Sequence, residues 1–358
     1  MNNKLICQGC GTLKQNKDKD KEGFIVDLNQ DLCKRCFDLK HYNKISDIKN
    51  KIPEKKIYTI LSELITKDSN LYLVIDIFNL EFKIQRLKEY IDGKKFSNIF
   101  VVINKFDILP KSLKFHKIDK YVRGVLDSIN YDGLIYVSAL KNLNHELIAN
   151  KIVDAKQKNN YFIGYANSGK SLIITKILKS LGVESKILVS EIPGTTLGKI
   201  DVKYKDKSII DLPGFYNKDS YTNYLSKADI ELINIKSEIK QINYSLHSNE
   251  VIFIDKNLIL NSWSSTEKKI NYQFFFSNRI GYHKTKINNI DKNKNNIKFK
   301  METENELISS DIKIPNDNNN YDIVVCDFGR IRTIGLGQKI KIWTIKNTKP
   351  IITKSFIS

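Results

Sequence analysis

Residues 164–171 carry the residue types that bind phosphate groups. They follow the pattern G-x-x-x-x-G-K-S in full, after a strand-like run and at the start of a helix-like one, which is the context that this motif requires. Glycines let successive backbone N–H groups turn around phosphate oxygens, the lysine meets the β and γ phosphates, and the serine hydroxyl is a ligand for Mg²⁺. The segment predicts a nucleotide site, and its binding residues are Gly164, Asn167, Ser168, Gly169, Lys170 and Ser171.

A second motif, N-K-F-D at residues 104–107, indicates which base is bound. The Asp107 carboxylate can accept hydrogen bonds from the N1–H and N2–H₂ groups of guanine, whereas adenine has no such pair of donors. The S-A motif, Ser138-Ala139 at the end of the run GLIYVSAL, adds a second base-side loop whose backbone can contact guanine O6. Alone, N-K-x-D is often only a polar strand end, but beside a phosphate loop it predicts GTP rather than ATP. The predicted base-site residues are Asn104, Lys105, Asp107, Ser138 and Ala139.

Two later segments complete a nucleotide-hydrolysis site. The run P-G-T-T at 193–196 places hydroxyls of Thr195 and Thr196 where one can bind Mg²⁺. The run D-L-P-G at 211–214 supplies a carboxylate, Asp211, and a glycine, Gly214, whose N–H can sense the γ-phosphate. We therefore expect hydrolysis of GTP to GDP, with Lys170, Thr196, Asp211 and Gly214 acting on the phosphates and the metal.

The order of these motifs along the chain is unusual. In an ordinary GTPase the phosphate loop comes first and N-K-x-D and S-A come last, whereas here those two precede the other three. The cyclic order is kept, so the same sheet can form, because chain termini of compact domains often lie close together. The sequence predicts a circularly permuted Ras-like domain. The segment after D-L-P-G-F then runs directly into the C-terminal part, which predicts that γ-phosphate loss is transmitted along the backbone.

Four of the five cysteines form the pattern C-x₂-C-x₂₂-C-x₂-C near the N-terminus. This spacing is close to that of two knuckles sharing one tetrahedral zinc ion, and the predicted ligands are Cys7, Cys10, Cys33 and Cys36. A redox pair is the alternative for a single C-x-x-C. Basic residues beside the second knuckle, Lys34, Arg35 and Lys40, offer phosphate contacts. We expect His41 to be a surface residue and Cys326 to be a buried apolar one.

Composition and length indicate a multidomain globular protein. The chain has 358 residues, 41% of them apolar and 28% charged, and this length predicts two or three domains. The net charge of +19 favours polyanionic partners, with nucleic acid first. A lysine and asparagine bias of the source genome is the alternative. Because the chain has no apolar run of membrane-spanning length and no signal core, we expect a cytoplasmic protein without a membrane partner.

Three modules are expected. Residues 1–45 form the zinc module. In residues 46–228, strand-like and helical runs alternate from Leu71 onwards, which predicts an α/β domain with a largely parallel sheet. A helical connector is expected at residues 41–70 and a β-hairpin at 199–214. Residues 229–358 are expected to form a C-terminal α+β domain that binds RNA or the ribosome.

With these features the sequence resembles the YqeH-type circularly permuted GTPases, which act in small-subunit ribosome assembly. The resemblance rests on the four cysteines, the permuted motif order, VIDIFNLE before N-K-x-D, and the stretches SNRIGYHKTKI and DIVVCDFGRIRTIGLGQKIKIW. It implies a zinc finger, Mg²⁺ and GTP/GDP as cofactors, and ribosomal RNA in the small subunit as partner, with no small-molecule substrate besides GTP and water. Two features depart from the family: Gly198 replaces a commonly acidic residue, and DKNLIL at 255–260 replaces a glycine-rich strand.

The resemblance also implies how hydrolysis proceeds. Phe215 stands where many small GTPases carry the glutamine that orients water. The family is of the hydrophobic-substituted kind, in which a bound K⁺ stabilises charge, and Asn167 is the matching ligand. Asn167 as a loop-capping residue is the alternative. We expect slow intrinsic hydrolysis that K⁺ or a ribosomal particle stimulates.

Strand periodicity places Lys339, Lys341 and Trp343 on one face of a C-terminal strand, where two charges and a stacking ring suit looped RNA. Lysines protecting a sheet edge are the alternative. We expect the aromatic residues of 274–276 to lie in the core. The main function predicted is a GTP-hydrolysing switch on immature small subunits. An RNA-binding scaffold with a non-hydrolysing GTP site, or a GTPase in tRNA modification, are the alternatives.

Overall fold

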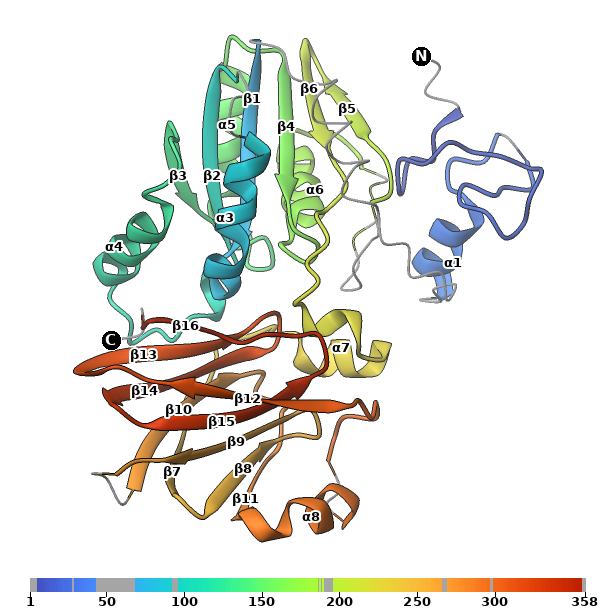
Figure 1. Ribbon diagram of the computed structural model, residues 1–358. Helices are drawn as coiled ribbons and strands as arrows, with labels where there is room; N and C mark the ends of the chain where they lie inside the picture. Colours follow the sequence, from blue (N-terminus) through green and yellow to red (C-terminus); the bar gives the residue numbers. More distant parts are fainter. Residues whose placement is uncertain are drawn as a thin grey trace. The chain divides into compact units, whose positions relative to one another are not determined.

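The computed structural model describes residues 5–27, 29–42, 68–91, 96–185, 187, 189, 196–265, 269–296 and 299–355 (Figure 1). The chain divides into two compact units. The first unit contains residues 1–107 and 127–217, and the second unit contains residues 108–126 and 218–358. Most of the helical connector expected at 41–70 lies outside the described residues. No helix in the described ranges is long and apolar enough to cross a membrane.

A six-stranded sheet forms the centre of the first unit, in the order β3-β2-β1-β4-β6-β5. All neighbouring pairs are parallel except β5 and β6, which form the expected hairpin. The strands are β1 (Ser69–Asp76), β2 (Asn98–Asn104), β3 (Gly133–Tyr136), β4 (Asn159–Gly164), β5 (Ile200–Tyr204) and β6 (Lys207–Asp211). The predicted α/β alternation and parallel sheet are therefore confirmed.

Helices cover both faces of this sheet. Helix α3 (Leu80–Ile91) lies on one face, and α5 (His145–Asp154) and α6 (Lys170–Ser180) pack side by side on the other (Figure 1). In α6 the apolar residues recur along one side of the helix, and Ile173 and Ile177 are fully buried against the sheet residues Val74 and Val102. This packing fixes the end of β4 and the start of α6, which is where the phosphate loop lies.

The N-terminal segment of the first unit is small and has one helix, α1 (Lys34–Tyr42), within the described residues. Isolated bridges join Ile6 to Leu13 and Gln15 to Phe24. Each bridge closes a short loop, and the first loop carries Cys7 and Cys10. A segment with so few apolar residues cannot build a large core, so it depends on the cysteine cluster described below.

The second unit contains two antiparallel sheets of five strands, in the orders β16-β13-β14-β10-β7 and β11-β8-β9-β15-β12. Their inner faces share one core, in which Phe274 and Phe276 are buried as expected and Tyr221 stacks on Phe328 with ring centroids 4.7 Å apart. The helices are α4 (Phe115–Leu126), α7 (Lys227–Ile233) and α8 (Ile290–Asn296). The strands are β7 (Ile242–His247), β8 (Glu250–Ile254), β9 (Leu258–Trp263), β10 (Lys269–Phe276), β11 (Tyr282–Lys286), β12 (Leu307–Lys313), β13 (Asn316–Val325), β14 (Gly329–Leu336), β15 (Lys339–Ile345) and β16 (Ile351–Lys354).

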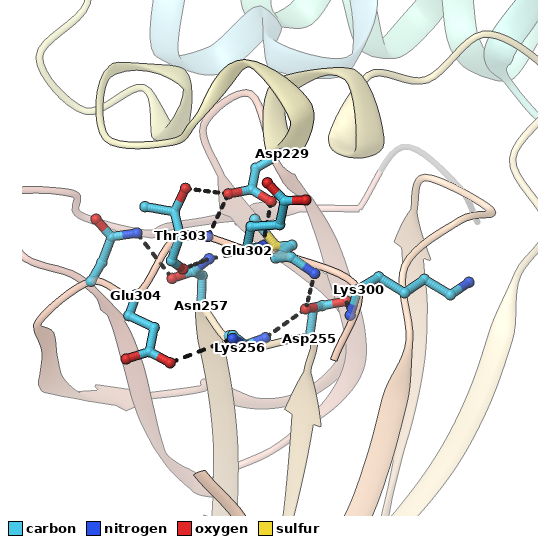
Figure 2. A network of polar contacts seen from close by, with 10 residues as sticks. Asp229, Asp255, Lys256, Asn257, Lys300, Glu302, Thr303 and Glu304 are labelled. Carbon is cyan, nitrogen blue, oxygen red and sulfur yellow. Dashed lines mark hydrogen bonds and ion pairs between the residues drawn. The ribbon is translucent and has the colours of Figure 1, made fainter. Parts of the chain in front are cut away.

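Two buried carboxylates hold the segment before β12 in place (Figure 2). Asp229, in the first turn of α7, accepts hydrogen bonds from the N–H groups of Glu302 at 2.7 Å and Thr303 at 2.8 Å. Asp255, in the turn between β8 and β9, accepts one from Met301 N–H at 2.9 Å. Burial alone would raise the pKa of Asp229, but hydrogen bonds from the Thr303 hydroxyl and from the N–H groups of Glu302 and Thr303 bring that pKa below its usual range. Because backbone donors occupy both carboxylates, we assign them a structural role.

Candidate functional site: a nucleotide site and a four-cysteine cluster

The phosphate loop is a tight turn between β4 and α6, in which two positions need glycine. A side chain at Gly164 would overlap the Val74 carbonyl oxygen of β1, and one at Gly169 would overlap the Asn104 amide. Gly169 has φ +83° and Asn167 has φ 63°, both in the left-handed region. This conformation turns the chain sharply before the first residue of α6, Lys170. The motif therefore has the loop geometry that its sequence predicts.

Three predicted phosphate and metal residues converge on a fourth, Asp211. Lys170 Nζ pairs with Asp211 Oδ1, and Asp211 Oδ2 accepts hydrogen bonds from Ser171 Oγ at 2.8 Å and Thr196 Oγ1 at 3.3 Å. The Ser171 and Thr196 hydroxyl oxygens are themselves 3.3 Å apart. Two hydroxyl oxygens and a carboxylate are a ligand set suited to Mg²⁺, which prefers oxygen. Thr195 lies outside the described residues.

Asn104 joins the base-reading motifs to the phosphate loop. Its Nδ2 donates to the Ser168 carbonyl oxygen at 2.8 Å, and its Oδ1 accepts from Ala139 N–H at 3.2 Å. Ser138 Oγ caps the following turn by accepting from Lys141 N–H. One buried side chain thus links three segments that are far apart in the sequence, which is the convergence that the permuted order predicts.

Asp107 has an open acceptor. Its Oδ2 is buried, and no hydrogen-bond partner for it occurs in the described part of the chain. A buried carboxylate oxygen without a donor is costly unless a ligand supplies one. The N1–H and N2–H₂ groups of guanine are donors of the required kind, so the residues present fit the base that the sequence predicts.

The sequence interpretation gave no role to Asp76, although the structure places it at this site. Asp76 is paired in register with Asn104 across β1 and β2, and its Oδ2 accepts from Lys105 Nζ at 2.7 Å. Burial alone would raise the pKa of this carboxyl, but the ammonium groups of Lys105 and Lys83 and a hydrogen bond from Phe78 N–H hold it below its usual range. Asp76 therefore positions Lys105. The available signal was an aspartate at the carboxyl end of the strand next to N-K-x-D.

The segment after Asp211 lies against the phosphate loop. Phe215 N–H donates to the Gly164 carbonyl and Phe215 C=O accepts from Ala166 N–H, both at 3.0 Å. A side chain at Gly214 would lie 2.9 Å from the Ala166 nitrogen. The Phe215 ring is buried edge-on against Tyr165. Gly214 thus sits where only backbone fits, and Phe215 is a packing residue rather than a group that orients water.

The four N-terminal cysteines form one cluster. Their sulfur atoms all lie within 4.8 Å of one another, and all four residues are buried. Four sulfurs at the usual zinc distance occupy the corners of a tetrahedron with edges of about 3.8 Å, and Cys10 Sγ and Cys33 Sγ are 3.9 Å apart. The spacing of the cluster fits a closed four-sulfur zinc shell, and Cys7, Cys10, Cys33 and Cys36 are the residues that would hold the ion.

The exposure of His41 and the burial of Cys326 are as expected from the sequence. His41 is exposed and lies 4.4 Å, centroid to centroid, from the Phe37 ring, and Cys326 is buried in the second unit. Lys34 and Lys40 are exposed on α1. Their phosphate contacts, with those of Arg35, stay a prediction.

The residues predicted to contact RNA, Lys339, Lys341 and Trp343, lie on an interior strand of a sheet. Strand β15 pairs with β9 on one side and β12 on the other, so the explanation that its lysines protect a sheet edge is wrong. Lys339 and Lys341 alternate with buried isoleucines as expected, and Lys341 Nζ lies 5.6 Å from the centre of the Trp343 ring. Cross-strand register adds Trp263 and Lys313 beside Lys339, and Asp311 beside Lys341. We call Lys339, Lys341, Trp343, Trp263 and Lys313 the β15 face.

Comparison with known proteins agrees with the geometry. The family described as 50S ribosome-binding GTPase matches residues 159–273, so the match begins at β4 and leaves N-K-x-D and S-A on its N-terminal side. The "GTPase Der" of Mycoplasma mycoides is 23% identical over 225 residues, 55% of this chain and 49% of that protein. The "NO-associated protein 1" of Arabidopsis thaliana is 27% identical over 246 residues, 59% of this chain and 43% of that protein.

A further relative extends over most of both chains. The "Uncharacterized protein YqeH" of Bacillus subtilis is 30% identical over 298 residues, which is 80% of each protein. The similarity spans both the nucleotide motifs and much of the second unit. Together with the phosphate loop, the reordered motifs and the cysteine cluster, it identifies the chain as a member of the YqeH family of circularly permuted GTPases.

Proposed function

We propose that the protein is a GTP-hydrolysing switch that acts in the assembly of the small ribosomal subunit. GTP binding is supported chiefly by the hydrogen bonds of Asn104 to Ser168 and Ala139. These bonds join the N-K-x-D segment, the S-A segment and the phosphate loop. Such a junction supports a site in which a base lies beside Asp107 while phosphates lie beside Lys170. A chain that used these motifs only structurally would not need an open buried acceptor at Asp107.

Each site residue has a role in this proposal. Lys170 neutralises the β and γ phosphates, and the backbone of residues 164–169 donates hydrogen bonds to them. Ser171, Thr196 and Asp211 hold Mg²⁺, which supplies charge neutralisation at the transferred phosphoryl group. Gly214 N–H reports the γ-phosphate, and Thr195 is a second candidate switch hydroxyl. Asn104, Lys105, Asp107, Ser138 and Ala139 read the guanine.

Hydrolysis by the chain alone is slow in this proposal, because Phe215 is buried and offers no polar group to the attacking water. We expect K⁺ to raise the rate over Na⁺ at equal ionic strength, with Asn167 as its ligand from the left-handed turn of the loop. The measurement is phosphate release in each salt, for wild type and for Asn167→Ala. Equal rates in both salts for both proteins would contradict the role of K⁺ and of Asn167 as its ligand. That result would not contradict GTP hydrolysis itself.

The partner in this proposal is ribosomal RNA in a small-subunit precursor, and the β15 face is the contact surface. Cationic side chains with aromatic rings suit single-stranded or looped RNA. The matched family description names the 50S particle, so the test must distinguish the rRNA of the two subunits.

We also propose that the chain acts in the cytoplasm. Its three proposed modules are residues 1–45, 46–228 and 229–358.

The partner is tested by pull-down from cell extract with a non-hydrolysable GTP analogue or with GDP, followed by sequencing of the bound RNA. We expect small-subunit rRNA to be captured in the presence of only one of the two nucleotides, the GTP analogue or GDP. The variant Lys339→Gln/Lys341→Gln should capture this RNA about 10-fold more weakly, because two phosphate contacts are lost. The matched control is Lys88→Gln/Lys120→Gln, two exposed lysines on α3 and α4. Enrichment of large-subunit rRNA, of tRNA, or of the same RNA with either nucleotide would contradict the proposal.

A further inference from the structure

The first zinc knuckle, residues 7–12, is hydrogen-bonded to the segment that carries the switch threonine. The Cys10 carbonyl oxygen accepts from Leu197 N–H at 2.8 Å and from Gly198 N–H at 2.9 Å. These are the two residues after Thr196, whose hydroxyl lies 3.3 Å from both Asp211 Oδ2 and Ser171 Oγ. The carbonyl group of Cys10, a residue of the four-cysteine cluster, is thus hydrogen-bonded to the backbone that directly follows Thr196.

The two segments also touch through glycine backbones. A side chain on Gly198 would lie 2.6 Å from the Gly11 carbonyl carbon and would overlap its oxygen, and one on Gly11 would lie 2.6 Å from the Gly198 carbonyl. Only glycine at both positions allows this approach. It also gives a physical reason for Gly198, where the family commonly has an acidic residue, because no larger side chain fits against the knuckle.

The knuckle is closed by backbone hydrogen bonds where it makes this contact. Cys10 is fully buried with its sulfur in the four-cysteine cluster. Backbone hydrogen bonds from Gly11 N–H to Cys7 C=O at 2.8 Å and from Cys7 N–H to Thr12 C=O at 2.9 Å close the loop around it. A metal ion on the four sulfurs fixes the Cys10 peptide group, and that peptide group fixes Leu197 and Gly198. Leu197 is itself buried, which adds apolar contact to the hydrogen bonds.

We propose that the zinc knuckle holds the switch segment in the conformation that binds Mg·GTP, with Cys10, Gly11 and Gly198 as positioning residues for Thr196. In P-loop GTPases the switch threonine is ordered by the Mg²⁺ and γ-phosphate of GTP, and not by GDP. A segment that is already ordered loses less conformational freedom on binding, so affinity rises. Zinc and GTP therefore favour each other's binding in this chain, whereas zinc and GDP do not. This inference rests on the proposed GTP site.

Gly198→Ala tests the coupling because it breaks the backbone contact without changing a cysteine or a nucleotide motif. Loss of two hydrogen bonds of ordinary net strength predicts a GTP-analogue affinity about 10-fold to 100-fold weaker. GDP affinity should stay within about twofold, and the bound zinc should stay at about one ion per chain. Fluorescent nucleotide titration and a colorimetric zinc assay measure the three quantities. Gly124→Ala is the matched control, since its side chain would meet no atom within 4 Å, and all three quantities should match the wild type.

A second measurement uses the reciprocity of linked equilibria. If bound zinc raises the affinity for the GTP analogue by some factor, the bound analogue must raise the affinity for zinc by that same factor. Competition of the full chain with a zinc chelator, in GTP analogue or in GDP, should show a difference of about 10-fold to 100-fold for wild type and none for Gly198→Ala. Equal zinc affinities in the wild type, or an undiminished difference in the variant, would overturn the inference. A wild type that binds no GTP at all would instead overturn the proposed function, so the two failures are distinguishable.

Discussion

An Asp107→Asn variant is expected to bind GTP about 10³-fold to 10⁵-fold more weakly than wild type and to accept xanthosine triphosphate in its place. The Asp107 Oδ2 atom is buried, with no donor in the described part of the chain, so it is available to a ligand. An asparagine amide turns an N–H₂ group towards the guanine N2–H₂, which leaves two donors facing each other. Xanthine has a carbonyl oxygen at that position and restores the hydrogen bond.

Competition titrations with GTP, xanthosine triphosphate and ATP measure the change in base preference. Asp154→Asn, at the exposed end of α5, is the matched control and should leave all three affinities unchanged. If wild type binds ATP as tightly as GTP, or if Asp107→Asn retains its GTP affinity, then Asp107 does not read the base and the nucleotide assignment fails.

A Lys170→Ala variant is expected to lose both hydrolysis and stability. Phosphate release should fall about 10²-fold to 10³-fold, because a positive charge on the phosphates is removed. The free energy of unfolding without nucleotide should fall by about 3 kcal/mol, because Asp211, which has no exposed surface, is left as a buried charge without its ammonium partner. Urea unfolding and phosphate release measure the two effects.

The double variant Lys170→Ala/Asp211→Ala separates stability from catalysis. Removing both charges leaves no unpaired ion, so part of the lost stability should return, while phosphate release should stay at least as low as in Lys170→Ala. Lys179→Ala, in the exposed last turn of α6, should change neither quantity appreciably. A double variant as unstable as the single one would show that the buried pair is not what Lys170 contributes to the fold.

Much of the first unit could be predicted from the sequence because its elements are set by local patterns. Short runs of β-branched residues alternate with amphipathic helices, and the β5–β6 hairpin has a turn at Lys205, with φ 50°. The largely parallel sheet was also predictable, because the permuted motifs keep their cyclic order. Boundaries were less exact. The run YVRGVLDSI indicates a helix from Tyr121, whereas helix α4 begins at Phe115 and also buries Ile118.

Contacts between distant segments could not be predicted in this way. Asp76 meets Lys105 only because β1 and β2 are parallel and in register. The position of β15 inside its sheet depends on β9 and β12, which are about 80 and about 30 residues earlier in the chain, and strand periodicity says nothing about neighbours. The approach of Gly198 to Gly11 is a backbone contact without any side-chain pattern. These features need the packed structure.

The chain passes between its two units at three points, after Asp107, after Leu126 and after Asn217. Three covalent tethers therefore join the two units, where a simple two-domain chain has one linker. The first tether leaves from the residue assigned to the base, and the third leaves three residues beyond Gly214, which is assigned to the γ-phosphate. The two assigned ends of one small molecule are therefore each followed, within a few residues, by chain that belongs to the second unit.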